Sequence, residues 1–231
     1  MVQKIDNIGI VITCYNRPHL LKKTLDDLNN TDYTNEINRG CVIIIDDSST
    51  NDETIKLVVD FKLSFSENWE LIKIMHNKNK QMYNSLREGF DLLVANEYTN
   101  LCNLDSDVLL KSNWLLKLIR LYKMFPDTII SGFNFRLPSV IADECKFYKD
   151  GYLLKQGTGG INFLFSKETY YKYVRDAFNN KLQWDWKVSD NLAKDNKMFV
   201  ITKPSVIQHN VDISDKDNIS NGFNIVALDF E

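Results

Sequence analysis

The chain has 231 residues, of which 44% are hydrophobic and 26% are charged, and its formal net charge is −3. This composition is typical of a globular chain with a sizeable core, organised as one large domain or two small ones. The slight negative charge argues against a nucleic-acid binder, which needs a basic face. No stretch approaches the roughly 18 consecutive apolar residues of a membrane span. Residues 1–8 lack the basic start and long apolar stretch of a signal peptide.

The four cysteines, Cys14, Cys41, Cys102 and Cys145, lie far apart and form no CxxC pair. The first three lie in or beside apolar, strand-like runs, where a thiol usually acts as a small buried hydrophobic group. We therefore expect a reducing compartment. The protein is expected to be cytoplasmic, and either soluble or at most peripheral at a membrane.

The first half of the chain alternates short apolar, β-branched runs with amphipathic segments. The runs predict buried strands at residues 8–13, 41–45, 71–75 and 100–104. The segments between them predict helices at residues 18–29, 52–61 and 81–95, with Pro18 in the first turn of the first and Asp52 capping the second. This alternation predicts an α/β fold with a mostly parallel sheet flanked by helices.

The second half is less regular. Helices are predicted at residues 114–125, from residue 167 and from about residue 184, and strands at residues 128–135, 161–165 and 198–202. Residues 140–156 are polar and have no clear period, which fits either a surface loop or a flap over a binding site. Residues 212–231 form a polar tail.

Three polar clusters directly follow predicted strands. They are residues 13–17, 46–49 and 105–107. Ligands bind to open parallel sheets at the carboxyl ends of the strands. We therefore expect the three clusters to line one crevice.

Four parts of the sequence occur in a characteristic order. They are VITCYNRPHLLKKTLDDL (11–28), VIIIDDSSTNDET (42–54), LCNLDSDV (101–108), and WDWKVSDNL (184–192) with PSVIQH (204–209). This ordered set resembles glycosyltransferase family 2 and its GT-A relatives. The resemblance implies a single domain with the GT-A (Rossmann-like) fold, a nucleoside diphosphate sugar as donor and a divalent metal ion. On this reading, residues 1–110 are a nucleotide-binding half, residues 111–211 an acceptor-binding and catalytic half, and residues 212–231 the tail.

The resemblance also implies a metal site. The last aspartate of the family's DxD motif binds the metal and corresponds to Asp107, while Asp105 and Ser106 are assigned to the nucleotide sugar. A late histidine often completes the metal shell, and His209 is the candidate. A carboxylate with an imidazole suits Mn²⁺ better than Mg²⁺, which prefers oxygen ligands but remains a second option. The alternatives are a solvated Asp-Ser-Asp turn and an ordinary histidine.

The nucleotide is assigned to the loops after the first two strands. By resemblance Asp47 holds the base, and a carboxylate there can accept the imide N–H of uracil, which cytosine lacks. Thr13 and Arg17 are expected in the same pocket, and Tyr15 could pack against the base or ribose. The alternative for residues 46–49 is a turn and helix cap without a ligand.

Two further segments are assigned to the donor. Gly159 and Gly160 resemble the glycine pair that runs under the donor sugar in these enzymes, the alternative being an ordinary glycine turn. Residues 76–82 (HNKNKQM) lie where relatives have a glycine-rich turn that touches the nucleotide. This chain has no glycine there, and Lys80 is the candidate contact.

Asp185 is the predicted general base. Inverting relatives carry a Glu-Asp pair at the start of a helix, whose aspartate deprotonates the acceptor hydroxyl; here Trp184 replaces the glutamate. The helix dipole would lower the pKa of such a carboxylate and burial would raise it. The alternatives are that Asp185 only caps the helix, or that Asp190, expected to be solvated, is the base.

Aromatic side chains could offer faces to a sugar ring. The candidates are Trp184, Trp186, Phe133 and Phe135. For the two phenylalanines, core packing is the expected role.

Together these assignments predict a hexosyltransferase that moves a sugar, with inversion, from a UDP-sugar to a glycan, glycoconjugate or other hydroxyl acceptor. One alternative is a sugar nucleotidyltransferase, which usually needs a glycine-rich loop after the first strand; here that loop reads CYNRP. The other is an inactive nucleotide-sugar-binding module, against which the retained Asp105, Asp107, Asp185 and His209 argue.

Overall fold

The computed structural model describes residues 5–32, 36–64, 67–134, 145–149, 151–210, 227 and 229–230, with only the backbone described at 145–149. Phe135, residues 140–144 and 150, and residues 211–226, 228 and 231 lie outside this part. The predictions for Phe135 and for most of the polar tail therefore concern residues that are not described.

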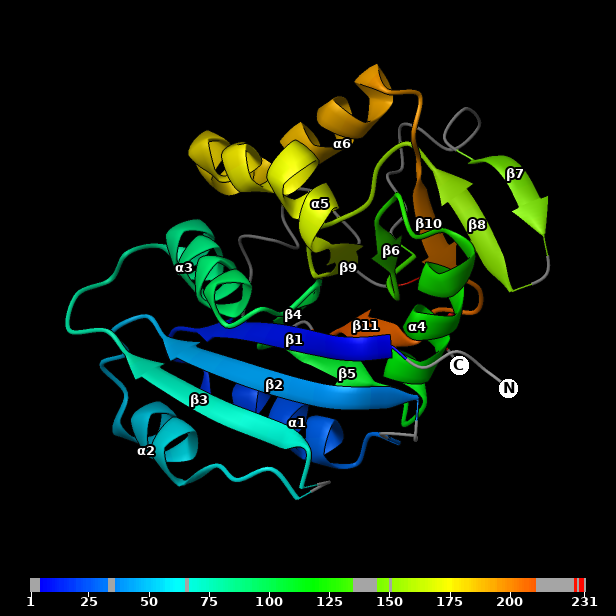
Figure 1. The fold of residues 1–231 in the computed structure, drawn as a ribbon. Coiled ribbons are helices and arrows are strands. Elements are labelled where there is room, and N and C mark those ends of the chain that lie inside the picture. Colours follow the sequence, from blue (N-terminus) through cyan, green and yellow to red (C-terminus); the bar gives the residue numbers. More distant parts are fainter. Residues whose placement is uncertain are drawn as a thin grey trace.

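The first half forms the predicted alternation of strands and helices (Figure 1). The strands are β1 (Ile5–Cys14), β2 (Ile37–Asp46), β3 (Trp69–Met75) and β4 (Asn100–Asp105). The helices are α1 (Pro18–Asn29), α2 (Asp52–Asp60) and α3 (Met82–Ala95). The predicted cap of α2 is wrong by one residue, because Asn51 accepts a hydrogen bond from the Thr54 N–H at 3.0 Å and Asp52 is already helical.

The second half adds shorter elements. The strands are β5 (Val108–Leu110), β6 (Ile130–Ser131), β7 (Cys145–Lys149), β8 (Tyr152–Lys155), β9 (Asn162–Ser166), β10 (Phe199–Thr202) and β11 (Ile207–His209). The helices are α4 (Trp114–Met124), α5 (Lys167–Thr169), η1 (Tyr170–Val174), η2 (Arg175–Gln183) and α6 (Trp184–Lys194).

The described strands form a nine-stranded sheet in the order β3-β2-β1-β4-β9-β6-β10-β8-β7, with β5 and β11 in a separate two-stranded sheet. The pairs β3–β2, β2–β1 and β1–β4 are parallel, and β9 is antiparallel to both β4 and β6. The predicted α/β fold with a mostly parallel central sheet flanked by helices is confirmed, and the half beyond β4 is mixed.

Two predictions for the second half need correction. The strand expected at residues 128–135 is only two residues long in β6. The stretch from 140 to 156 contains the antiparallel pair β7–β8 rather than a loop alone. Its pattern was obscured because a buried position of β8 is occupied by Lys155, whose ammonium donates to Asn134 Oδ1 at 3.1 Å.

Apolar residues cover both faces of the parallel strands. Alternate residues of β1 point to opposite sides, so that Ile10 packs with α1 and α2 while Val11 packs with α3. Figure 1 shows α1 and α2 on one face of these strands and α3 on the other. With both faces covered, the strand-end loops are the part of this sheet open to a ligand.

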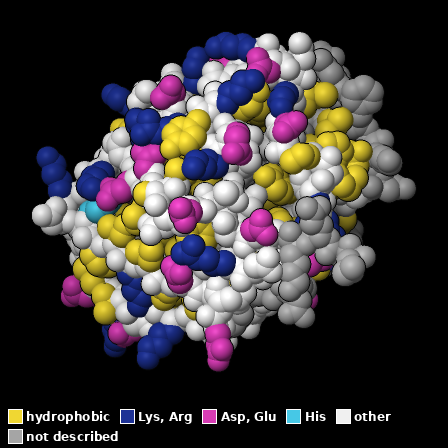
Figure 2. Space-filling view, in the orientation of Figure 1, with side chains coloured by type: hydrophobic (Ala, Val, Ile, Leu, Met, Phe, Trp, Pro, Cys, Tyr) yellow, Lys and Arg dark blue, Asp and Glu magenta, His cyan; other side chains and the backbone are white. Residues whose placement is uncertain are grey.

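Among the described residues, no helix is long and apolar enough to cross a membrane. On the face that Figure 2 shows, Lys and Arg side chains are interspersed with Asp and Glu rather than gathered into one basic patch.

Candidate active site

The sheet register brings the polar clusters to one edge. Thr13 near the end of β1 is paired with Asp105 at the end of β4, and Cys14 is paired with Asp46 at the end of β2. These strands are parallel, so the loops that follow them leave the sheet on the same side. The predicted convergence of the three clusters is therefore found.

A cavity of about 450 Å³ lies at this edge. Its walls come from the loops after β1, β2, β3 and β4 and from the end of η2. The lining residues are Thr13, Cys14, Tyr15, Arg17, Asp47, Asn79, Gln81, Met82, Asp105, Ser106, Asp107 and Leu182. Seven of the predicted site residues are in this set, and the size suits a small-molecule ligand.

The loops after β1 and β2 are bonded to each other. Asn16, at φ 55°, donates its N–H to Ser49 Oγ at 2.8 Å. Its side-chain oxygen accepts from the N–H groups of Thr50 and Asn51 at 3.0 and 3.1 Å. Asp46 Oδ2 accepts from the Ser49 N–H at 3.0 Å. Asp46 thus stabilises the turn, while its neighbour Asp47 lines the cavity.

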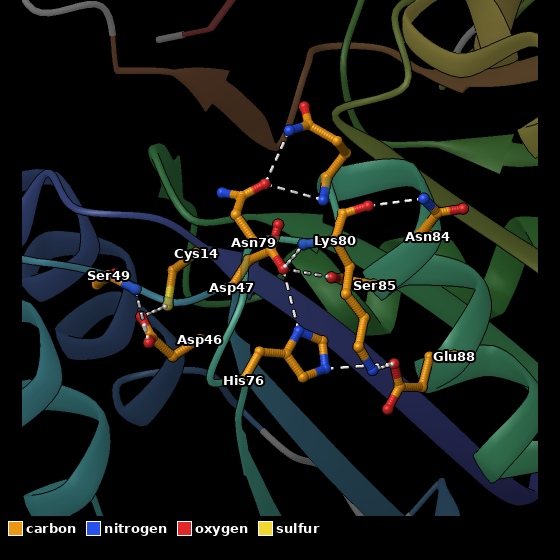
Figure 3. A network of polar contacts seen from close by, with 11 residues as sticks. Cys14, Asp46, Asp47, Ser49, His76, Asn79, Lys80, Asn84, Ser85 and Glu88 are labelled. Atoms are coloured by element: carbon orange, nitrogen blue, oxygen red, sulfur yellow. Dashed lines mark hydrogen bonds and ion pairs between the residues drawn. The ribbon is translucent and has the colours of Figure 1, made fainter.

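Asp47 lies at the centre of a buried polar network (Figure 3). It is 3% exposed, and its Oδ1 accepts from His76 Nδ1 at 3.0 Å, from the Lys80 N–H at 2.8 Å and from Ser85 Oγ at 3.1 Å. The Lys80 ammonium bonds Glu88 Oε2 at 2.7 Å, on α3. Lys80 therefore reaches Asp47 through its backbone, and its charge is directed to Glu88.

The turn before α3 adopts a glycine-like conformation without a glycine. Gln81 has φ 74° and ψ 141°, a backbone conformation that residues other than glycine rarely adopt. Asn79 Oδ1 accepts from the Gln81 N–H at 3.0 Å and from its Nε2 at 2.8 Å. These two bonds stabilise the turn and keep both side chains at the cavity.

Asp107 and His209 are brought together by the pairing of β5 with β11, in which His209 lies opposite Val108. His209 Nε2 is 3.2 Å from Asp107 Oδ2, and Arg17 Nη1 is 3.4 Å from the same oxygen. The Nδ1 of His209 is buried and has no hydrogen-bond partner among the residues that the structure describes. No group of three or more His, Cys, Asp and Glu side chains suited to a metal occurs among the described residues, so this pair offers two donors.

Asp105 is the most strongly perturbed carboxyl group of the site. Burial raises its pKa well above the ordinary range, and the nearby carboxylates of Asp107 and Asp185 raise it further. A cation beside Asp107 would relieve this repulsion. The three aspartates therefore form one electrostatic unit although Asp185 comes from the other half of the chain.

Asp185 lies in the first turn of α6. Its Oδ2 accepts from the Gly160 N–H at 3.2 Å and its Oδ1 from the Trp186 N–H at 2.9 Å. Burial raises the pKa of Asp185, and these two backbone donors partly oppose the rise. Asp190, one turn and a half further along α6, is exposed as expected.

The two glycines differ in how tightly they are packed, and the two tryptophans differ in exposure. A Cβ at Gly160 would lie 2.5 Å from Trp184 Cζ2, whereas one at Gly159 would lie at an ordinary 3.7 Å from Phe133. Trp184 is only 3% exposed and cannot offer a face to a sugar, so that expectation is wrong. Trp186 is 46% exposed, and Phe133 is buried as expected.

Several residues at the site were not predicted. They are the cavity-lining Cys14, Asn79, Gln81, Met82 and Leu182, and the network residues His76, Ser85 and Glu88. The segment HNKNKQM contained four of them, and its position after β3, at the same sheet edge, was the available signal.

The family described as glycosyl transferase family 2 matches residues 9–142, which is more than half of the 231 residues. The match begins within β1 and includes β2 to β4, the loops after these four strands and the Asp105-Ser106-Asp107 turn. It ends before Asp185 and His209, so the match does not cover these two residues. No curated protein matches the chain significantly. The extent of the family match, together with the α/β fold and the convergence of its strand-end loops, shows that the chain belongs to glycosyl transferase family 2.

Proposed function

We propose that this glycosyltransferase moves a sugar from a UDP-sugar to a hydroxyl group of a glycan or glycoconjugate, with a divalent metal ion and with inversion of the anomeric centre. The observation that carries this proposal is the placement of Asp107 beside His209 at the cavity that Asp47 also lines. The same cavity therefore has a carboxylate, Asp107, that can bind a metal ion together with His209, and a second carboxylate, Asp47, that can accept a hydrogen bond from a nucleobase.

The metal would be held by Asp107 Oδ2 and His209 Nε2. The two atoms are 3.2 Å apart, close enough to bind one ion, and one is an oxygen and the other an imidazole nitrogen. This donor set favours Mn²⁺ over Mg²⁺. With two protein donors, the shell is left open for diphosphate oxygens and water. When bound, the ion would neutralise the charge of the leaving diphosphate.

The nucleotide would lie against the loops after β1, β2 and β4. Asp47 has an oxygen available to accept the uracil imide N–H, since its bonds to the described residues all end on Oδ1. Tyr15 is half-exposed at the cavity and can pack against the base or ribose. Thr13, Arg17 and Ser106 line the same cavity.

Asp185 would act as the general base. It is partly buried, its carboxylate is oriented by the Gly160 and Trp186 N–H groups, and its raised pKa makes it a stronger base than an exposed aspartate. In-line displacement of the diphosphate requires such a base on the acceptor side, opposite the leaving group.

The acceptor would lie next to Asp185. Trp186 follows it in the chain and has nearly half of its surface exposed. Its neighbours Gln183 and Asp190 are exposed and polar. A flat apolar face with polar groups nearby suits a sugar ring, whose C–H face is apolar and whose edge carries hydroxyls.

The test is release of UDP from a panel of sugar nucleotides, with Mn²⁺, with Mg²⁺ and with EDTA. We expect metal-dependent release from one or a few UDP-sugars. Metal-dependent binding without turnover of any donor would indicate an inactive binding module. Release of pyrophosphate from a nucleoside triphosphate and a sugar phosphate would indicate a nucleotidyltransferase.

A further inference from the structure

His76 is a buried histidine between the cavity and α3. Its side chain is 5% exposed and its Nδ1 lies 3.0 Å from Asp47 Oδ1. Its Nε2 lies 3.2 Å from Glu88 Oε2, within ion-pair distance. A carboxylate oxygen only accepts, so the Nδ1 that bonds Asp47 Oδ1 carries a hydrogen.

Three donors meet on a single oxygen of Asp47. They are His76 Nδ1, the Lys80 N–H and the Ser85 hydroxyl, and Figure 3 shows their bonds ending on the same oxygen. A buried carboxylate is costly unless it is hydrogen-bonded, and these bonds provide the compensation. They also fix the plane of the carboxylate and leave Oδ2 without a hydrogen bond to the described residues, in a residue that lines the cavity.

The pair formed by Lys80 and Glu88 closes the outer side of the network. Lys80 Nζ bonds Glu88 Oε2 at 2.7 Å, and this bond is the main reason why the pKa of Glu88 is lowered. Glu88 thus remains a carboxylate against the His76 ring. Lys80 contributes twice, through its backbone to Asp47 and through its ammonium to Glu88.

We propose that His76 is a positioning residue for recognition of the donor base: it holds the Asp47 carboxylate so that Oδ2 meets the imide N–H of uracil. This inference rests on the proposed function, in which Asp47 accepts that hydrogen. Pre-orientation lowers the cost of ordering the carboxylate when the nucleotide binds. Without the His76 donor, the carboxylate keeps two of its three fixed bonds and can rotate away from the base.

Two substitutions separate positioning from packing. His76→Leu keeps a similar volume but removes the donor, whereas His76→Asn places an amide N–H where Nδ1 stands. We would titrate UDP and N3-methyl-UDP calorimetrically in the presence of Mn²⁺, and follow thermal unfolding of each variant. Asp47→Ala is measured beside them, because it tests the base contact itself.

We expect His76→Leu to weaken UDP binding about 10-fold, the scale of one hydrogen bond to a charged group. His76→Asn should retain most of the affinity, and N3-methyl-UDP, which lacks the imide hydrogen, should bind both variants as it binds the unmodified protein.

Three results would overturn the role of His76: wild-type UDP affinity in His76→Leu, equal losses in the Leu and Asn variants, or an equal loss for the two nucleotides. If Asp47→Ala binds UDP normally, the proposed contact between Asp47 and uracil is wrong, and the proposed role of His76 is wrong as well. If Asp47→Ala weakens UDP binding and His76→Leu does not, only the role of His76 is overturned.

Discussion

Gly160 lies directly against the indole of Trp184, so that a Cβ at residue 160 would stand 2.5 Å from Cζ2 and 3.1 Å from the Cβ of Asp185. The Gly160 N–H also donates to Asp185 Oδ2 at 3.2 Å. The lack of a side chain at residue 160 therefore allows the turn before β9 and the start of α6 to approach each other. This close packing explains the glycine without reference to a donor sugar.

We predict that Gly160→Ala destabilises the fold by about 1–3 kcal/mol, the usual scale for overpacking a core. The buried Trp184 ring has little room to move. Gly159→Ala is the matched control and should change stability little, because its nearest contact would be an ordinary 3.7 Å. Thermal or urea unfolding of both variants measures the difference, and equal stabilities would contradict this account of Gly160.

UDP binding should depend on a divalent metal through Asp107 and His209. Asp107→Ala and His209→Ala should each remove most of the gain in UDP affinity that Mn²⁺ provides. Calorimetric titration with Mn²⁺ and then with EDTA measures that gain. Equal UDP affinity in the two conditions for the unmodified protein would exclude this metal site.

Asp185→Asn should preserve donor binding and lower turnover by roughly 10²-fold or more, the usual scale for loss of a general base. Asparagine keeps the size of the side chain and an oxygen for one of the two backbone donors, but it cannot take a proton. Proton NMR of the product gives its anomeric configuration, which we expect to be inverted. Near-normal turnover of Asp185→Asn would contradict the role of Asp185 and make Asp190 the candidate base. A retained configuration would exclude an inverting mechanism.

The raised pKa of Asp185 predicts the acid side of the pH profile. The base must be ionised, and burial favours its neutral form, so the carboxylate is protonated at a higher pH than an exposed aspartate. Activity should therefore fall as the pH is lowered through this raised pKa. This pKa is measured from the pH dependence of kcat/KM for the acceptor, at saturating donor and Mn²⁺. Persistence of the same acid limb in Asp185→Asn would assign the limb to another group.

Trp186→Ala should raise KM for a glycan acceptor by about 10-fold while leaving hydrolysis of the donor unchanged, since an aromatic contact contributes on the order of 1 kcal/mol. Trp186→Phe keeps an aromatic face, so its KM for the acceptor should lie between those of the unmodified protein and the alanine variant. Initial rates against acceptor concentration give these values. An unchanged KM in the alanine variant would place the acceptor elsewhere.

The sequence by itself determined the parallel half of the fold and the cluster of polar residues at its edge. The strands β1 and β2 contain continuous apolar runs, and those of β3 and β4 are interrupted by Lys73 and Asn103. Each helix has its own hydrophobic stripe, so local patterns were sufficient. Parallel strands then force their carboxyl ends to one side, which places Asp47 near Asp107 without further information. The Asn51 cap of α2 and the β7–β8 pair were missed, the second because Lys155 breaks the apolar alternation.

Only the tertiary structure decided what lies beside these residues. His209 reaches Asp107 through the pairing of two three-residue strands, β5 and β11, which are too short to leave a pattern in the sequence. His76 meets Asp47 because β3 is paired with β2, and Trp184 is buried while Trp186 is exposed because α6 turns one side toward β9. Contacts of this kind join residues far apart in the chain, and their geometry is set by packing rather than by the local pattern around either residue.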